Sequence, residues 1–337
     1  MLTDGTDLGY RQQYTYIISI MENQQSYCSR REFLAAAGIL TAGIVLLPRN
    51  LFARQTSPVT TIIKEAGRSA VTIQKLRGNI SVIEGSGGNI TVFTGNEGKL
   101  LVDAGINVSE KKIKAALQKI STRPVKVLVN SHWHFDHTSG NEWVNKAGAT
   151  IVAHENTKKH LTETVRVEDW NYTFPPLPKA AIPTTIFKED YVVKFNGENI
   201  QLKKYSNAHT DSDISIYFPH ADVLHVADTW WNGHYPFIDY STGGTVQGMI
   251  KAAIENVDSV TDHTIIVPGH GPVGNKTQLI AYRDMLLDVT RKISSRKKAG
   301  ATMAEVVASK PTKAYDAKWG TFVIKGDFFT NIIYRGV

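Results

Sequence analysis

Residues 131–137 read Ser-His-Trp-His-Phe-Asp-His, which places three imidazoles and a carboxylate within six positions. In an extended chain, His132 and His134 are two residues apart, so their side chains leave on the same side and can share one ion. Asp136 and His137 follow at once, where a turn into a helix would direct them toward a second ion. Imidazole and carboxylate are ligands that zinc prefers. The spacing therefore predicts a two-metal hydrolytic site, and a histidine-rich surface turn is the weaker alternative.

A site for two ions needs more ligands than one loop supplies, and three further candidates follow along the chain. They are His209, before the apolar run 214–218, Asp228, at the end of the run 223–228, and His270, in a Pro-Gly-His-Gly motif. All three are expected just past the end of a strand, where α/β architectures place chemistry. Taken singly, each is equally well explained as an ordinary polar loop residue. Together they indicate the missing ligands.

These motifs and the segment Leu100-Leu-Val-Asp-Ala-Gly105 resemble the metallo-β-lactamase superfamily over about residues 75–290. The resemblance implies an α/β fold, a four-layer αββα sandwich with the site at one edge of two facing sheets. By the same resemblance, Asp103 is a carboxylate that steadies the ligand loop without binding metal. The implied ligands are His132, His134 and His209 for the first metal, Asp136, His137 and His270 for the second, and Asp228 as the bridge between them.

The ligand set predicts how such a site works. Two zinc ions per chain, ~3.5–4 Å apart, can share a water and lower its pKa from ~15.7 toward neutrality, and the resulting hydroxide attacks an acyl carbon. Asp136 is predicted to orient that hydroxide as the catalytic residue. The only cysteine, Cys28, precedes the expected domain, so the β-lactamase branch that uses a cysteine ligand is excluded. A Ser-His-Asp triad is disfavoured because the chain has no Gly-x-Ser-x-Gly motif.

The motifs are specific for the superfamily but not for the substrate. Asp228 resembles the bridging aspartate of the glyoxalase-II-like and lactonase-like branches, and a cysteine-free β-lactamase branch also exists. We therefore expect a metallo-hydrolase of a small-molecule acyl bond, a β-lactam or lactone first and a thioester next. An iron-dependent oxidoreductase and a non-catalytic binding protein are the alternatives from other classes. The intact ligand set disfavours the binding protein.

Residues 1–53 are predicted to lie outside the fold and to direct export. Ser29-Arg-Arg-Glu-Phe-Leu34 resembles the twin-arginine export motif. The apolar stretch 33–47 is shorter than the ~20 residues that a membrane span needs, which favours a signal peptide. Cleavage after Ala53 predicts a periplasmic protein without a stable membrane anchor, and an uncleaved anchor is the alternative. Met21 is a second candidate for the true start.

The rest of the chain is predicted to form a catalytic domain over residues 54–300, with a C-terminal helix and tail over 301–337 packed on it. The first 53 residues hold four basic and four acidic side chains, so the rest carries the whole net charge of +7. This basicity favours anionic substrates, although a solvated basic surface is the simpler explanation. Export and the lack of interleaved basic and aromatic residues disfavour nucleic acid as a partner. The expected partner is a small-molecule substrate, and the sequence indicates no oligomeric state.

Hydrophobic periodicity predicts the elements that position these motifs. Strands are expected over 80–84, 89–94, 99–103, 125–130 and 150–153, and helices over 109–120, 140–147, 245–257, 276–296 and 303–309. Ser109 is expected to cap the first helix. Prolines make residues 160–190 an extended connection that either lines the substrate groove or covers the fold. Trp230 and Tyr235, which follow Asp228, are candidates for an apolar wall of the substrate site or for the core.

Overall fold

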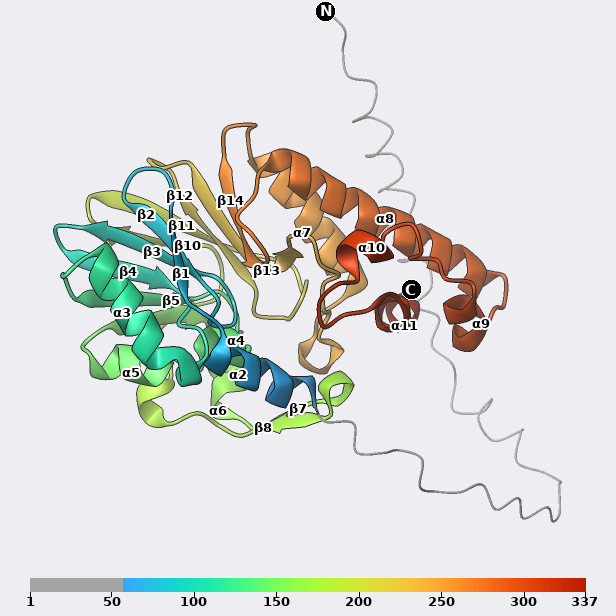
Figure 1. The fold of residues 1–337 in the computed structure, drawn as a ribbon, viewed down its shortest axis with the longest axis horizontal. Coiled ribbons are helices and arrows are strands. Elements are labelled where there is room, and N and C mark those ends of the chain that lie inside the picture. Colours follow the sequence, from blue (N-terminus) through green and yellow to red (C-terminus); the bar gives the residue numbers. More distant parts are fainter. Residues whose placement is uncertain (1–56) are drawn as a thin grey trace, which may run out of the picture. The chain divides into compact units, whose positions relative to one another are not determined.

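Two β-sheets face each other in the computed structural model, which describes residues 57–337 (Figure 1). The predicted leader, 1–53, lies outside the described residues. The seven-stranded sheet consists, in spatial order, of β1 (Thr72–Lys75), β2 (Ile80–Glu84), β3 (Ile90–Gly95), β4 (Gly98–Val102), β5 (Val125–Asn130), β6 (Thr150–His154) and β9 (Thr185–Phe187). The five-stranded sheet consists of β10 (Tyr191–Phe195), β11 (Glu198–Lys204), β12 (Ile214–Phe218), β13 (Val223–Trp231) and β14 (Ile265–His270).

Strand direction determines which strand ends meet at the site. In the first sheet, β1 to β4 are antiparallel, while β4, β5, β6 and β9 run parallel. In the second sheet the only parallel pair is β13 with β14. Parallel strands present their carboxyl ends at the same edge of a sheet, and ligand sites form in the crevice beyond those ends. The loops after β5 and β14 and the end of β13 therefore supply candidate ligands.

The main hydrophobic core lies between the two sheets. Its side chains come from alternate positions of the strands, because residues i and i+2 share one face of a sheet. Phe93 of the first sheet lies against Phe195 and Phe218 of the second, with ring centroids 6.5 and 5.6 Å apart. Other buried members are Ile80, Val82, Leu100, Val102, Val129, Val152, Ile200, Leu202, Ile214, Ile216, Val223 and Val267. The core thus joins the two sheets that carry the site.

Helices cover the outer face of each sheet (Figure 1). On the seven-stranded sheet, α3 (Glu110–Ile120) and α5 (Asn141–Lys146) close a second apolar cluster that includes Ile113. On the five-stranded sheet the covering helices are α7 (Val246–Ser259) and α8 (Lys276–Lys298). The order of layers is helix, sheet, sheet, helix, and the predicted αββα sandwich is confirmed.

Two segments outside the predicted motifs complete the described chain. Helix α2 (Pro58–Arg68) begins at the cap Ser57, whose hydroxyl accepts from the Val59 amide at 3.3 Å. The C-terminal helices are α9 (Met303–Ala308), α10 (Asp316–Trp319) and α11 (Gly326–Gly336). They pack on the helix and sheet layers described above. Helix α11 contacts α8, and the Tyr240 hydroxyl donates to the Ile332 carbonyl of α11 at 2.6 Å. No helix of residues 57–337 is both long and apolar enough to cross a membrane.

The predicted strands and helices agree with the structure to within two residues at each end, but two expectations were wrong. Ser109 occupies the predicted N-cap position of α3, but its side chain makes no capping hydrogen bond; its hydroxyl instead donates to the Ala66 carbonyl of α2 at 2.9 Å. Residues 160–190 are not a purely extended connection. They contain the end of α6 (Glu155–Thr162), a hairpin of β7 (Val165–Val167) with β8 (Tyr172–Phe174), and β9, which extends the seven-stranded sheet. The prolines at 175, 176, 178 and 183 lie between β8 and β9, so they interrupt no strand.

Candidate metal centre

The loop after β5 carries four of the candidate ligands. His132 follows the buried strand directly, and His134 is the N-cap residue of the one-turn helix α4 (Phe135–Thr138). This turn holds Asp136 and His137, and the His137 amide donates back to the His134 carbonyl at 3.1 Å. The expected turn into a helix after His134 is therefore present, and it directs four side chains from six positions into one buried volume.

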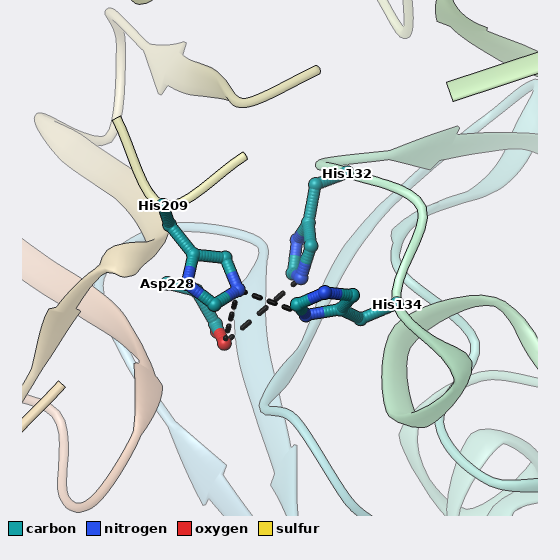
Figure 2. A group of neighbouring side chains, drawn as sticks. All are labelled: His132, His134, His209 and Asp228. Carbon is teal, nitrogen blue, oxygen red and sulfur yellow. Dashed lines mark hydrogen bonds and ion pairs between the residues drawn. The ribbon is translucent and has the colours of Figure 1, made fainter. Parts of the chain in front are cut away.

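The three distant candidates reach the same volume from the other sheet. His209 lies in the loop before β12, Asp228 lies within β13, and His270 ends β14. All seven side chains are nearly or fully buried. Figure 2 shows His209, Asp228, His132 and His134 converging on one point from separate elements. Sequence analysis thus identified residues that the fold brings together.

The first group consists of His132, His134, His209 and Asp228, whose nearest ligand atoms all lie within 4.8 Å of one another. His209 Nε2 is 2.8 Å from His134 Nδ1, and both nitrogens face the Asp228 carboxylate (Figure 2). Asp228 Oδ2 is 3.4 Å from His209 Nε2 and 3.9 Å from His132 Nε2. Three imidazole nitrogens and one carboxylate oxygen at this spacing form a set that can hold a metal ion.

The second group consists of Asp136, His137 and His270, also within 4.8 Å of one another. His270 Nε2 lies 3.2 Å from Asp136 Oδ2. Asp228 reaches this group too, because its Oδ1 is 3.1 Å from His137 Nε2 and its Oδ2 is 3.5 Å from His270 Nε2. One carboxylate therefore borders both groups, which is the position that the predicted bridging ligand requires.

Each histidine of the β5 loop, and His209, uses one ring nitrogen to face the site. The other ring nitrogen has a hydrogen-bond partner in the surrounding protein. His132 Nδ1 is 3.0 Å from the Ser131 hydroxyl, and His209 Nδ1 donates to the Phe237 carbonyl at 2.8 Å. His134 differs because its Nδ1 faces the site while its Nε2 is 3.1 Å from a carboxylate oxygen of Asp239. Such partners fix ring orientation and leave the other nitrogen free for an ion.

Asp103 holds the ligand loop in place from the end of β4. Its carboxylate accepts from the Ser131 amide at 2.8 Å and from the Ser131 hydroxyl at 2.6 Å. The same carboxylate lies 2.7 Å from His137 Nδ1 and does not belong to either ligand group. Asp103 has a left-handed backbone with φ of 65°, a conformation that costs energy for a residue other than glycine. This geometry matches the steadying role predicted for it.

The protonation states of three candidate ligands favour metal binding. Burial opposes ionisation of Asp228, yet His270 and His137 together hold its pKa well below the usual value. Burial, reinforced by the neighbouring His137, lowers the pKa of His132. Burial lowers the pKa of His209 as well, with His134 adding to the effect. Ionised carboxylate and neutral imidazole are the forms that bind metal, so these three ligands are in the required protonation states. The other two imidazoles are not: burial opposes their protonation, but Asp228 and Asp136 raise the pKa of His137 well above its usual value and that of His270 to about 9, so both rings must lose a proton when an ion binds.

Three atoms of the site are buried without a hydrogen bond of good geometry among the described residues: His132 Nε2, His137 Nε2 and Asp228 Oδ1, the last two facing each other as an ion pair at 3.1 Å. Leaving such atoms unpaired is costly, whereas a cation between them would satisfy all three. Glycines keep the space open, because a Cβ at Gly88 would collide with the His137 ring and one at Gly269 with Asp228 Oδ1. The residues present therefore fit a metal centre.

A cavity of about 470 Å³ opens onto the second group. Asp136, Asp228 and His270 line its floor. Its walls come from elements far apart in the sequence, namely α2 and the segment 322–323. The wall also includes Glu84, Gly85, Gly87, Asn89, Trp170, Trp231, His234, Gly271 and Pro272. A substrate in this cavity would contact ligand residues on one side and largely apolar side chains on the other.

Known proteins show similarity to the part of the chain that carries these ligands. A model of the metallo-beta-lactamase superfamily matches residues 83–274, more than half of the chain. The chain belongs to the metallo-beta-lactamase superfamily.

Individual relatives agree with this assignment. A probable metallo-hydrolase of Bacillus subtilis is 25% identical over 179 residues, which covers 51% of this chain and 79% of the relative. A probable metallo-hydrolase of Methanocaldococcus jannaschii is 24% identical over 183 residues, covering 52% of this chain and 84% of the relative.

Solved structures share the superfamily fold. A metallo-beta-lactamase from Pontibacter korlensis has a TM-score of 0.52 at 19% identity, and the match covers 64% of this chain and 98% of that one. A stereoselective inverting sec-alkylsulfatase from a Pseudomonas species has a TM-score of 0.61 at 17% identity, covering 79% of this chain. The match spans only 50% of the alkylsulfatase.

The superfamily match includes the ligands but not all of the cavity. Both α2 and the segment 322–323 lie outside residues 83–274. In this metallo-beta-lactamase-fold protein, the part that matches the superfamily supplies the candidate metal ligands, and segments outside that part supply some of the cavity wall.

Of the two alternatives for Trp230 and Tyr235, the structure supports the core and not the wall of the cavity. Trp230 and Tyr235 are both 0% exposed and neither lines the cavity; Tyr235 stacks on Phe329 instead. Trp231 lines the cavity, with its ring 4.5 Å from that of His270. Simple strand alternation would put residue 230 on the face of Asp228, but the register with β14 shifts between Ala227 and Trp231. Trp170, from the proline-rich region, also lines the cavity.

Sequence reasoning missed Asp239, which no motif or spacing marks. It is fully buried, and besides His134 it accepts from the Thr242 hydroxyl at 2.7 Å. Replacing Asp239 with asparagine is expected to weaken zinc binding about 10–100-fold, because the orientation and basicity of the His134 ring depend on this carboxylate. Competition with a chromophoric chelator measures the affinity, and Asp288→Asn on α8, which pairs with Lys292 at the surface, is the control. Unchanged affinity in the Asp239 variant would contradict this role.

Proposed function

We propose that this protein is an exported hydrolase with two zinc ions, acting on an acyl bond of a small molecule, a β-lactam or lactone first. The observation that carries the proposal is the Asp228 carboxylate, which lies within 3.5 Å of His137, His209 and His270. A single carboxylate shared by two imidazole clusters suits two neighbouring ions better than one. Zinc matches the nitrogen and oxygen donors, and iron on the same ligands is the alternative.

When bound, two such ions would lower the pKa of a water between them and polarise the substrate carbonyl. The first group would hold one ion and the second group the other, with Asp228 facing both. The chain's own residues then have separable tasks. His132 and His209 contribute neutral nitrogens, and Asp103 and Asp239 keep His137 and His134 in orientation.

Asp136 is the proposed catalytic residue. Its carboxylate lines the floor of the cavity, and Oδ2 is 3.2 Å from His270 Nε2. Burial opposes its ionisation, but His137 and His270 bring the pKa of Asp136 below the usual value, so it is a carboxylate at neutral pH. An ionised oxygen at this position can accept a hydrogen bond from the attacking water and orient it toward the acyl carbon.

The cavity supports a small-molecule substrate. Its volume suits a ligand of modest size, and its apolar wall can take the part of the substrate that does not react. A glyoxalase-II-like thioester fits the same reasoning and is the next candidate. Export to the periplasm is proposed from the twin-arginine-type motif at Ser29–Leu34, which lies outside the described residues.

The test is an assay of the purified, zinc-reconstituted protein against a β-lactam, a lactone, a thioester and a secondary alkyl sulfate. Hydrolysis of one acyl class is expected, abolished by a chelator and restored by zinc. Metal analysis of the protein as isolated separates zinc from iron. No acyl hydrolysis by protein with two zinc ions bound would contradict the proposal, and redox activity with bound iron would favour the alternative.

A further inference from the structure

The residues that line the cavity carry charge of one sign only. Apart from the ligands on its floor, the ionised side chains of the lining are Glu65 of α2 and Glu84 at the end of β2. Neither lysine nor arginine lines it among the described residues. His234 also lines the cavity, and burial, together with His270 and Lys325, lowers its pKa. At neutral pH, His234 therefore adds no positive charge.

Three cations lie close in the sequence to the lining residues, and none of them lines the cavity: Lys64, Arg68 and Lys325. Arg68 Nη1 lies 3.7 Å from Glu65 Oε1 in a pair whose side chains are both more than half exposed, so the attraction is screened by water. The Lys325 ammonium donates to the Gly320 carbonyl at 3.0 Å and does not line the cavity. An anionic group in the cavity would have no basic partner in its wall.

Glu84 is the more enclosed of the two carboxylates. It forms no ion pair with another described residue. Burial raises the pKa of Glu84, while a hydrogen bond with Thr72 acts the other way, and no cation contributes to the shift. Among the described residues, no cation is thus paired with Glu84 that would offset its repulsion of an anion.

The remaining wall is apolar. Ile62 and Ala66 of α2, Trp231 of β13, Pro272 and Phe322 all line the cavity. The Phe322 ring is 6.1 Å from that of Trp231 and 6.2 Å from that of His270, so an apolar surface adjoins the ligand floor. A hydrophobic acyl chain could lie there while its carbonyl faces the metal centre.

We propose that this cavity selects esters and lactones whose acyl part is apolar and uncharged, and that Glu65 and Glu84 discriminate against substrates carrying a carboxylate. The proposal rests on the proposed function and narrows it. Among the acyl classes above it favours neutral lactones over β-lactams, whose ring system bears a carboxylate. It also runs against the preference for anionic substrates that the overall net charge of +7 favours. We expect the charges of the cavity wall, and not the net charge of the protein, to decide which substrates bind, because screening limits the reach of distant surface charges to ~10 Å.

Two 4-nitrophenyl esters of equal chain length test the selectivity: the neutral hexanoate and the anionic hemiadipate. The zinc-reconstituted full-length protein is expected to hydrolyse the hexanoate with a kcat/KM about tenfold higher, after correction for uncatalysed hydrolysis, a size typical of partly screened like charges. In the double variant Glu65→Gln/Glu84→Gln this ratio should fall severalfold, mainly through the KM for the hemiadipate. The double variant Glu163→Gln/Glu189→Gln, at exposed positions that do not line the cavity, should keep the original ratio.

A binding measurement separates this inference from the proposed function. The non-hydrolysable pair hexyl 4-nitrophenyl ether and 6-(4-nitrophenoxy)hexanoate should quench tryptophan fluorescence with the same preference for the neutral compound, because Trp231 and Trp170 line the cavity. Preferential ether binding without ester turnover would overturn the hydrolase and retain the selectivity. Turnover of both esters at equal kcat/KM would overturn the selectivity and retain the hydrolase. A ratio unchanged in the Glu65/Glu84 variant would remove both residues from the proposed role.

Discussion

Replacing Asp228 with alanine is expected to abolish hydrolysis, lowering kcat/KM by more than about 10³-fold, and to reduce bound zinc from two ions per chain to one or none. The reason is the shared position of this carboxylate. Its Oδ1 is 3.1 Å from His137 Nε2, and its Oδ2 is 3.4 Å from His209 Nε2 and 3.5 Å from His270 Nε2. Among the described residues, no other carboxylate pairs with imidazoles of both ligand groups, so its loss would remove a donor from each ion together with the charge that compensates them.

Elemental analysis of the dialysed protein, in parallel with steady-state kinetics, measures this effect. Asp288→Ala on α8 removes an aspartate that pairs with Arg291 and Lys292, accepts a hydrogen bond from the Tyr315 hydroxyl at 3.0 Å and belongs to neither ligand group, and it should keep both ions. Circular dichroism of the Asp228 variant distinguishes an emptied site from an unfolded protein. A folded Asp228 variant that still binds two zinc ions would disprove the bridging role.

The second large effect is expected from Asp136→Asn, which should lower kcat roughly 10²–10⁴-fold while KM changes little. Asparagine keeps the size and one oxygen donor of the side chain but cannot take up a proton as a carboxylate does. In the native chain, His137 and His270 offset the opposing effect of burial and hold the pKa of Asp136 below its usual value. The variant therefore removes a charge on the cavity floor without emptying the site.

Kinetics and zinc content must be read together for this variant. Loss of turnover with two zinc ions retained would support the role of Asp136 in orienting the attacking water, whereas loss of one ion would make Asp136 mainly a ligand. Asp211→Asn is a suitable control, since Asp211 pairs with His160 at 2.7 Å near Trp133 but does not belong to either ligand group. Native kcat in a fully loaded Asp136 variant would exclude the catalytic assignment.

Much of the fold could be predicted because its signals are local. Strand β5 is a continuous apolar run whose predicted bounds match the structure, and α8 and α9 were located to within two residues. Errors arose where long-range contacts prevail over local preference. Ser109 has the chemistry of a helix cap, yet its hydroxyl donates to α2, more than forty residues away in the sequence. The segment at β9 is too short and proline-rich to be recognised locally, but it pairs in parallel with β6.

The metal centre was predicted for the same reason. Four of its candidate ligands occupy six consecutive positions, and the other three lie in the loop before β12, within β13 and at the end of β14, so the backbone itself brings them together. Asp239 was not predictable in this way, because only its contact with His134 distinguishes it from other loop aspartates.

What the sequence by itself determined is the chemistry: the ligand types, their spacing and their strand ends specify a metal-dependent hydrolase of this superfamily, because these are properties of short segments. The tertiary structure alone decided which substrate groups the site can contact. A shift in strand register placed Trp231 rather than Trp230 at the cavity. Packing of α2 and the segment 322–323, from opposite ends of the described chain, placed Glu65 and Phe322 in its wall. Such walls depend on contacts between residues hundreds of positions apart, which no local pattern encodes.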